Sequence, residues 1–510
     1  MNPRRLFIAS CIALITSAFS FMIRQDIADP LAADFSLTKQ AVGEVMGAAF
    51  LGMAVAMLVV APLCDYLGMG RVIMLAWLCH LTGILGTIFA PKPPTVSTDT
   101  SYWVLWCSTF LVGSGNGLVE IAINPLAATL YPRNKTHYLN ILHAWWPGGL
   151  IMSGLLAIFV INPLMGLSGE TVTPTDSSMG WKVKMALLLV PLAIYGLLSL
   201  GQRFPLTERV QAKVSTGEMF LQVLRPMFLL WAFCMLLTAS TELGPNQWQE
   251  SVLKRTAFEG AEPSYKWLGI FSQKGFGTLV FVYTSGLMFV MRFFAGPLAH
   301  RFSPVGMLTG SAVFSALGLY WLSYVNTPFM AFVAATVFGV GIAYFWPTML
   351  GVTAERFPKG GALLLGLMGS FGNLAISQAL PVMGAIYDSY TVANLSPELR
   401  AKTVTGADGK QIPVVTPGTE SWLPKAVTNE IYPAGTQKLN PDAVKLLSGQ
   451  DLREIQKAET VGAAHAFRWV AVLPSVLVVI FGLIALSDKL RGGYQPVHIE
   501  TGMPEEATPT

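Results

Sequence analysis

The fold is decided by a short polar stretch between two long apolar runs, Pro62-Leu63-Cys64-Asp65-Tyr66-Leu67-Gly68-Met69-Gly70-Arg71. The runs on either side, near residues 41–64 and 71–90, each approach the about 20 apolar residues that a membrane-spanning helix needs. A related stretch in the second half, Gly296-Pro297-Leu298-Ala299-His300-Arg301-Phe302, also separates two apolar runs. Two loops of this kind, each with a basic residue, predict that the two halves of the chain are built alike.

Outward from these loops, the apolar runs predict twelve membrane spans. Six precede a polar stretch from Gln202 to Leu224 and six follow it. The first run is longer than the roughly 7–15 apolar residues of a signal peptide, so we interpret it as a span. We predict an all-α membrane protein with 12 transmembrane helices in two pseudo-symmetric six-helix bundles. The spans lie near residues 6–28, 41–64, 71–90, 102–130, 139–162, 181–200, 226–250, 275–299, 305–325, 328–352, 361–388 and 466–487.

The composition is typical of a protein that is largely embedded in lipid. Of 510 residues, 53% are hydrophobic and 12% are charged, whereas soluble domains carry about 25% charged residues. The formal net charge of +4, with no basic tract interleaved with aromatics, argues against a nucleic-acid partner. The histidines form no ligand pair at short spacing, and the five cysteines lie within or at the ends of apolar runs. We therefore expect no metal, no cofactor and no enzymatic activity.

The basic residues predict which side of the membrane each loop faces. Arg4, Arg5, Arg71, Arg301 and Lys489 are among those at the N-terminus, after even-numbered spans or after the last span, whereas the connection near 251–274 breaks this pattern. We expect a bacterial inner membrane protein, monomeric, with both termini in the cytoplasm. The predicted divisions are a first bundle at 1–200, a linker at 201–225, helices 7–11 at 226–388, an extracytoplasmic cap at 389–464, helix 12 at 465–490 and a tail at 491–510. Within the cap, Asn440-Pro441-Asp442 predicts the start of a helix.

Charge inside the membrane points to function, because a charged residue at a helix centre costs about 2.5–3.5 kcal/mol on insertion scales. Glu120 lies near the middle of the fourth span, and Asn124, one turn later, shares its face. Pro125 frees a backbone carbonyl nearby, which is tolerated at membrane depth where it lines a cavity. We predict reversible proton binding at Glu120, against the alternative of a structural hydrogen bond. Asp26 lies past an apolar run, where Arg24 could pair with it.

The six-plus-six design, with its motif in the 2–3 and 8–9 loops, resembles the major facilitator superfamily. In that superfamily two halves rock about a site near the midplane. The resemblance implies gating contacts for Asp65 and Arg71, and for Arg301 in the second copy, which lacks the acidic residue.

Further motifs resemble the fucose/proton symporter family within it. In the first half these are Gln25-Asp26 before Pro30, Glu120 with Asn124-Pro125, and Leu139-Asn140-Ile141-Leu142-His143. In the second half they are Thr241-Glu242-Leu243-Gly244, Met291-Arg292-Phe293-Phe294-Ala295-Gly296, Tyr344-Phe345-Trp346-Pro347-Thr348 and Pro381-Val382-Met383-Gly384.

This family resemblance implies roles for individual residues. Asp26 and Glu120 would form the proton-coupling pair, and the coupling ion would be a proton, with sodium as the alternative. His143 and Trp146 fall where the family has other polar contacts, so the identity of the sugar is left open. Amide, carboxylate, guanidinium and indole groups suit sugar hydroxyls and ring faces. The predicted substrate contacts are Gln25, Asn124, His143, Trp146, Glu242, Asn246, Gln247, Arg292, Trp346, Asn373 and Gln378.

Two other functions stay open at this point. The first is an exporter of a drug or metabolite on the same fold, which Trp146-Pro147-Gly148-Gly149 faintly favours. The second is a membrane sugar sensor that does not transport. The Asn, Gln, His and Trp residues of the predicted cavity favour import of a small sugar by cation symport through alternating access.

Overall fold

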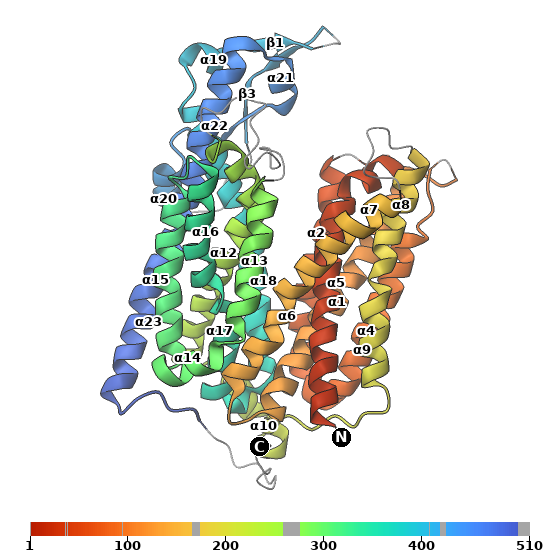
Figure 1. The fold of residues 1–510 in the computed structure, drawn as a ribbon, viewed down its shortest axis with the longest axis vertical. Helices are drawn as coiled ribbons and strands as arrows, with labels where there is room; N and C mark the ends of the chain where they lie inside the picture. The colour runs from red at the N-terminus through yellow and green to blue at the C-terminus, as the bar shows by residue number, and fades with distance from the viewer. Residues whose placement is uncertain are drawn as a thin grey trace.

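The computed structural model describes residues 2–35, 37, 39–93, 95–165, 174–258, 276–406, 409–418 and 425–497. Two bundles of long helices stand side by side, with a small cap above the second bundle (Figure 1). The start of α1, the end of α23 and the linker helix α10 lie at the opposite end from the cap. We call that end the terminal side and the other end the cap side.

The first bundle, which we call the first lobe, is built around the long helix α5. Helices α2 and α4 pack along α5, and α1 packs along α6. The long helices are α1 (Pro3–Asp34), α2 (Lys39–Val60), α4 (Met69–Ile88), α5 (Thr98–Leu130), α6 (Lys135–Leu156), α8 (Pro174–Leu187) and α9 (Leu189–Ser199). Short turns fill the connections: η1 (Ala61–Leu63), α3 (Cys64–Leu67), η2 (Ala157–Ile161) and α7 (Asn162–Leu164).

A linker with α10 (Glu208–Gln211) and α11 (Thr216–Leu221) leads to the second lobe. There α15 packs on α16 and α23, and α18 packs on α12 and α22. Its helices are α12 (Pro226–Thr256), α13 (Phe276–Arg292), α14 (Ala295–Phe302), α15 (Pro304–Leu322), α16 (Pro328–Ile342), α17 (Phe345–Arg356), η3 (Pro358–Gly360), α18 (Gly361–Ala393), α22 (Gly449–Val470) and α23 (Val472–Leu490).

The helices confirm the predicted membrane architecture. Among the described residues, eleven helices are long and apolar enough to cross a membrane. The shorter apolar helix Leu279–Arg292 stands where the eighth span is predicted. The chain is therefore an all-α integral membrane protein of two helical bundles.

The cap contains the only strands of the part of the chain that the structure describes. Strand β1 (Thr403–Thr405) pairs antiparallel with β2 (Gln411–Pro413), and β3 (Val415–Pro417) pairs antiparallel with β4 (Gln437–Leu439). A small apolar cluster that includes Leu399, Val414 and Leu447 packs inside it. Short helices complete it: α19 (Pro397–Ala401), α20 (Lys425–Ile431) and α21 (Pro441–Leu446), the last where Asn440-Pro441-Asp442 predicts a helix start. Helix α22 begins within the predicted cap range and runs down toward the last span.

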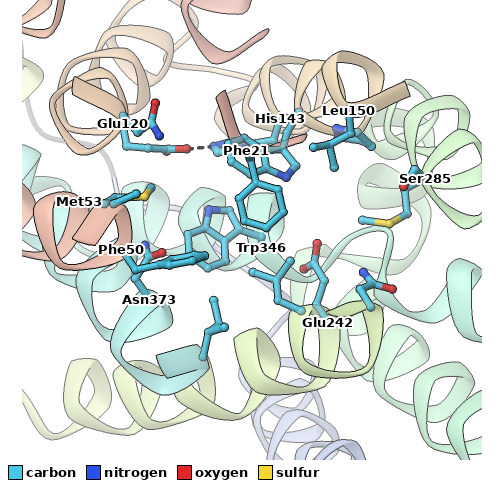
Figure 2. Close-up of a pocket in the computed structure, with 18 of the residues that line it drawn as sticks. Phe21, Phe50, Met53, Glu120, His143, Leu150, Glu242, Ser285, Trp346 and Asn373 are labelled. Atoms are coloured by element: carbon cyan, nitrogen blue, oxygen red, sulfur yellow. Dashed lines mark ion pairs between the residues drawn. The ribbon is translucent and has the colours of Figure 1, made fainter. Parts of the chain in front are cut away.

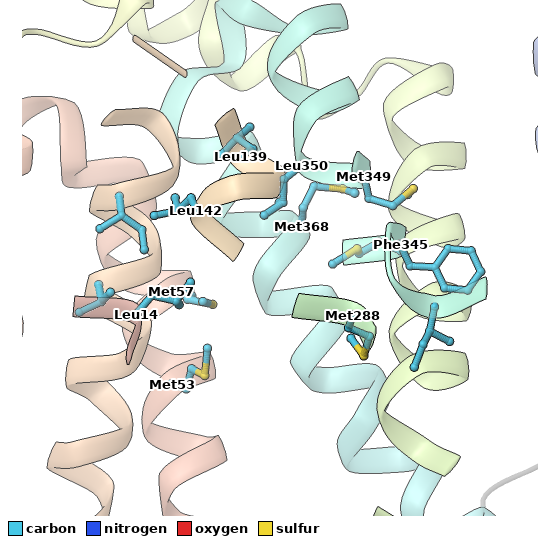
Figure 3. Close-up of a cluster of buried hydrophobic side chains, with 14 of the residues drawn as sticks. Leu14, Met53, Met57, Leu139, Leu142, Met288, Phe345, Met349, Leu350 and Met368 are labelled. Carbon is cyan, nitrogen blue, oxygen red and sulfur yellow. The ribbon is translucent and has the colours of Figure 1, made fainter. Parts of the chain in front are cut away.

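The two lobes are tied together on the terminal side. Lys135 donates to Glu208 of the linker at 2.6 Å and to the carbonyl oxygen of Ala354 at 3.3 Å. Thr136 donates twice to Glu355, through its backbone nitrogen at 3.1 Å and its hydroxyl at 2.7 Å. Figure 3 shows buried leucines and methionines of both lobes, among them Leu139 and Leu350, in a cluster that reaches the cavity at Met53 and Met288. These contacts close the terminal side.

Of the predicted gating residues, Asp65 makes the contacts between elements. Its carboxylate accepts from the Thr207 hydroxyl and from Nε of Arg209, each at 2.6 Å, and so fastens the linker to the first lobe. Arg71 is exposed and donates to the carbonyl of Leu67 at 3.4 Å, in its own loop. Arg301 is exposed and lies over the ring of Phe302. The gating roles of Arg71 and Arg301 stay predictions.

Close approach of α2 and α5 depends on glycine. A Cβ on Gly113 would lie 1.9 Å from the carbonyl oxygen of Ala49, so a side chain there pushes the two helices apart. We expect Gly113→Ala to destabilise the protein by about 1–3 kcal/mol, as overpacking does. The measurement is the thermal midpoint of the purified protein in detergent. Gly47→Ala on α2, where a Cβ meets nothing within 4 Å, is the matched control and should keep the midpoint. Equal midpoints for both variants would contradict the packing argument.

Candidate functional site

A cavity lies between the two lobes, and residues of both lobes line it. Figure 2 shows Glu120 and His143 of the first lobe on one side, and Glu242 and Trp346 of the second lobe on another. Phe21 and Phe50 pack edge to face at 5.9 Å and form part of its apolar lining. A few polar groups in an otherwise apolar, enclosed space are the usual composition of a small-molecule site.

Glu120 belongs to a hydrogen-bonded group of three residues. The amide nitrogen of Asn124 donates to Oε2 of Glu120 at 2.7 Å, and its carbonyl oxygen lies 2.9 Å from Nε2 of His143. Oε2 of Glu120 also lies 3.8 Å from that His143 nitrogen. All three side chains are at most 6% exposed. Asn124 thus joins an ionisable group on α5 to one on α6 without itself lining the cavity.

A proline and a helix end explain why backbone carbonyls take part in this site. A proline within a helix removes the hydrogen bond to the carbonyl four residues earlier. Pro147, inside α6, frees the carbonyl of His143. The carbonyl of Ala343 stands at the C-terminal end of α16, where it has no helical donor. Arg292 donates to both, through Nη1 to His143 at 2.6 Å and through Nε to Ala343 at 2.7 Å. One guanidinium therefore satisfies a freed carbonyl in each lobe.

The remaining side of Arg292 pairs with a carboxylate. Nη2 donates to Oε1 of Glu242 at 3.1 Å, and the two side chains are 2% and 5% exposed. A buried guanidinium with three acceptors is well compensated, which is the condition for keeping charge in a low-dielectric site. Arg292 therefore holds Glu242 at the cavity wall and joins α13 to α6.

The structure brings many of the predicted substrate contacts to the cavity. Besides Glu120, the lining includes His143, Trp146, Glu242, Asn246, Arg292, Trp346 and Asn373. Asn246 keeps a buried side-chain oxygen without a hydrogen-bond partner among the described residues. The amide nitrogen of Asn373 donates to the carbonyl of Gly369 at 2.9 Å.

Other predicted site residues lie elsewhere. Asp26 forms an ion pair with Lys184 of α8 and is not part of the lining, so it lies apart from the Glu120 group. Gln25 and Gln378 are exposed and also lie outside the lining. The side chain of Gln247 is outside the described part of the structure. The roles of Asp26, Gln25 and Gln378 stay predictions that the cavity geometry does not support.

Sequence reasoning missed Arg24 and Asn116, which both line the cavity. Arg24 stands at the end of an apolar run and was considered only as a partner for Asp26. The signal that could have identified it is spacing, because Phe21 and Arg24 are three residues apart and so share a helix face. Asn116 lies one turn before Glu120 and shares its face in the same way.

Replacing Arg292 alone should destabilise the protein more than replacing Arg292 and Glu242 together. Arg292→Met leaves Glu242 buried and unpaired, and breaking a buried pair in this way costs about 3–5 kcal/mol. The double variant Arg292→Met/Glu242→Gln should recover part of the loss. Thermal midpoints of the single and double variants, with Glu242→Gln alone as the control, measure the coupling. Strictly additive effects would contradict a direct interaction.

Two helical lobes around a largely apolar cavity, with contacts between the lobes at one end, are the arrangement expected of a membrane transporter. Residues 6–248 match the family model described as Major Facilitator Superfamily. The matched residues, just under half of the chain, are similar to transporters of this superfamily.

Individual relatives agree with this class. The cis,cis-muconate transport protein of Acinetobacter baylyi is 23% identical over 413 residues, which cover 75% of this chain and 91% of that protein. The fold is similar to that of FucP, the Escherichia coli fucose:proton symporter, in its outward conformation, with a TM-score of 0.58 and 15% identity over 92% of this chain and 99% of FucP. It is also similar to the proton:xylose symporter XylE, with a TM-score of 0.56 and 12% identity over 75% of this chain and 88% of XylE.

Proposed function

We propose that this protein imports a small sugar, a monosaccharide or a close relative, together with a proton by alternating access. The observation that carries the proposal is the buried carboxyl of Glu120 at the cavity wall, hydrogen-bonded to Asn124 and next to His143. A carboxyl that gains and loses a proton there changes the charge of the cavity as the lobes reorient. The solved relatives FucP and XylE are named as sugar symporters, which agrees with this assignment.

The cavity offers the groups that a sugar needs. Trp146 and Trp346 supply indole faces for the apolar side of a sugar ring. Asn246 and Asn373 supply amides for hydroxyl groups. We place the protein in a bacterial inner membrane as a monomer, with both termini in the cytoplasm. The contacts that close the terminal side then describe a carrier that receives its substrate from outside.

A route connects the proposed proton site to the second lobe. Glu120 is joined through Asn124 to the ring of His143, and the backbone carbonyl of that histidine accepts from Arg292. Protonation of Glu120 neutralises the carboxylate that accepts the hydrogen bond from Asn124. The altered hydrogen bonding would reach α6 at His143, where Arg292 of α13 is bound. The membrane potential adds about 2.3 kcal/mol per charge per 100 mV, so carrying a proton with a neutral sugar drives uptake.

Glu120→Gln tests the coupling. Because glutamine cannot release a proton, we expect exchange of labelled sugar across proteoliposomes to persist while accumulation driven by a proton gradient is lost. Counterflow and gradient-driven uptake of a panel of monosaccharides measure the two activities separately. The exposed Glu44→Gln is the matched control and should keep both.

Unchanged accumulation in Glu120→Gln would refute the coupling role. Accumulation that follows a sodium gradient and ignores the proton gradient would replace the proton with sodium. Absence of counterflow for every sugar in the wild-type protein would refute sugar transport.

A further inference from the structure

Arg24 is a buried cation without a counter-charge. It lies on α1, is 8% exposed and lines the cavity. Its Nε donates to the carbonyl of Ser20 at 2.8 Å, whereas its Nη1 is buried and finds no hydrogen-bond partner among the described residues. Across the described residues, no carboxylate forms an ion pair with this guanidinium. Asp26, two residues later, pairs with Lys184 instead.

Arg292, the other arginine in the cavity lining, has hydrogen-bond acceptors and a counter-charge around its guanidinium. Arg292 has a carboxylate and two carbonyls around its guanidinium. A buried charge is normally paired in this way because an unpaired one is strongly penalised. Arg24, which lines the cavity, has no such counter-charge among the described residues. Its missing acceptor is therefore expected to come from a molecule that enters the cavity.

The surroundings of Arg24 suit a ring that carries an acid group. Phe21, Phe50 and Trp146 form an aromatic cluster in the lining, with Phe21 5.9 Å from Phe50 and 6.0 Å from Trp146. The side chain of Asn116, also in the lining, is bonded to Ser20 and His80 and so is held in place. A guanidinium binds a carboxylate with strong, charge-assisted hydrogen bonds. The aromatic rings that share the lining with Arg24 offer apolar surface for the ring of such a molecule.

We propose that Arg24 binds a carboxylate of the transported substrate, so that the substrate is a ring-sized organic acid, a sugar acid in preference to a neutral sugar. The inference rests on the proposed transport function for the cavity, and it narrows the substrate class. Glu120 remains the proton site, on a different helix. A substrate anion carried with one proton would cross without net charge.

Binding to the purified full-length protein in detergent tests the assignment by calorimetry. The probes are D-glucuronate, its neutral counterpart D-glucose, and benzoate as a carboxylate without sugar hydroxyls. We expect D-glucuronate to bind about tenfold or more tightly than D-glucose, the margin of a charge-assisted hydrogen bond. Arg24→Gln should abolish that margin, and Arg24→Lys should retain part of it. Arg4→Gln, an exposed arginine at the start of the same helix, should leave it intact.

The thermal midpoint separates binding from a structural role. Because no carboxylate pairs with Arg24 among the described residues, Arg24→Gln should keep or raise the midpoint, whereas Arg292→Met lowers it. A fall as large as that of Arg292→Met would overturn the inference. So would equal affinity for D-glucuronate and D-glucose, or acid binding unchanged by Arg24→Gln.

The outcomes also separate this inference from the proposed function. If D-glucose is bound and accumulated while both acids are ignored, the carboxylate site is wrong and sugar transport stands. If benzoate alone binds, and only with Arg24 present, the carboxylate site stands and the sugar ring is wrong. If no probe binds, the carboxylate site is overturned, and counterflow with the panel of monosaccharides decides the proposed function separately.

Discussion

The site depends on the guanidinium of Arg292, which donates hydrogen bonds to two backbone carbonyls that have no helical donor. Pro147 in α6 and the end of α16 each leave a carbonyl without its helical donor, and Arg292 donates to both and to Glu242 as well. Without the arginine, two buried acceptors and a carboxylate would lose their partner. Because one carbonyl belongs to α6 and the other to the second lobe, this interaction also sets where the lobes meet. The cavity, the position of His143 and the contact between lobes follow from it.

The two kinds of contact between the lobes have different chemistry. On the terminal side, charged and hydroxyl groups of Lys135, Thr136 and Glu355 combine with buried apolar side chains. Beside the cavity, α6 meets α13 through aromatic packing, where Trp145 and Phe289 lie 5.5 Å apart. Polar groups exchange readily for water, and aromatic rings can stay packed while helices tilt. The lobes are therefore joined by polar and apolar contacts on the terminal side and by aromatic packing of α6 against α13 beside the cavity.

Hydrophobic runs predicted the architecture well, because each helix must supply about 20 apolar residues whatever it packs against. Glu120, His143 and Arg292 were found for the same reason, since charge or imidazole inside such a run is conspicuous. Which way a side chain faces near the end of a run was not predictable. Helix α1 continues to Asp34, beyond its apolar run, and its packing turns Asp26 toward Lys184 and Arg24 toward the cavity. That choice depends on α8, which is distant in sequence.

The cap has a mechanical consequence. It is built on α18 and α22, both of the second lobe, and β4 packs against α18. Helix α22 passes from the cap into the bundle without a loop, so the cap follows any tilt of that lobe as one lever (Figure 1). A small angular change deep in the bundle becomes a larger sweep at the far tip. The position of the cap relative to the first lobe therefore reports the angle between the two lobes.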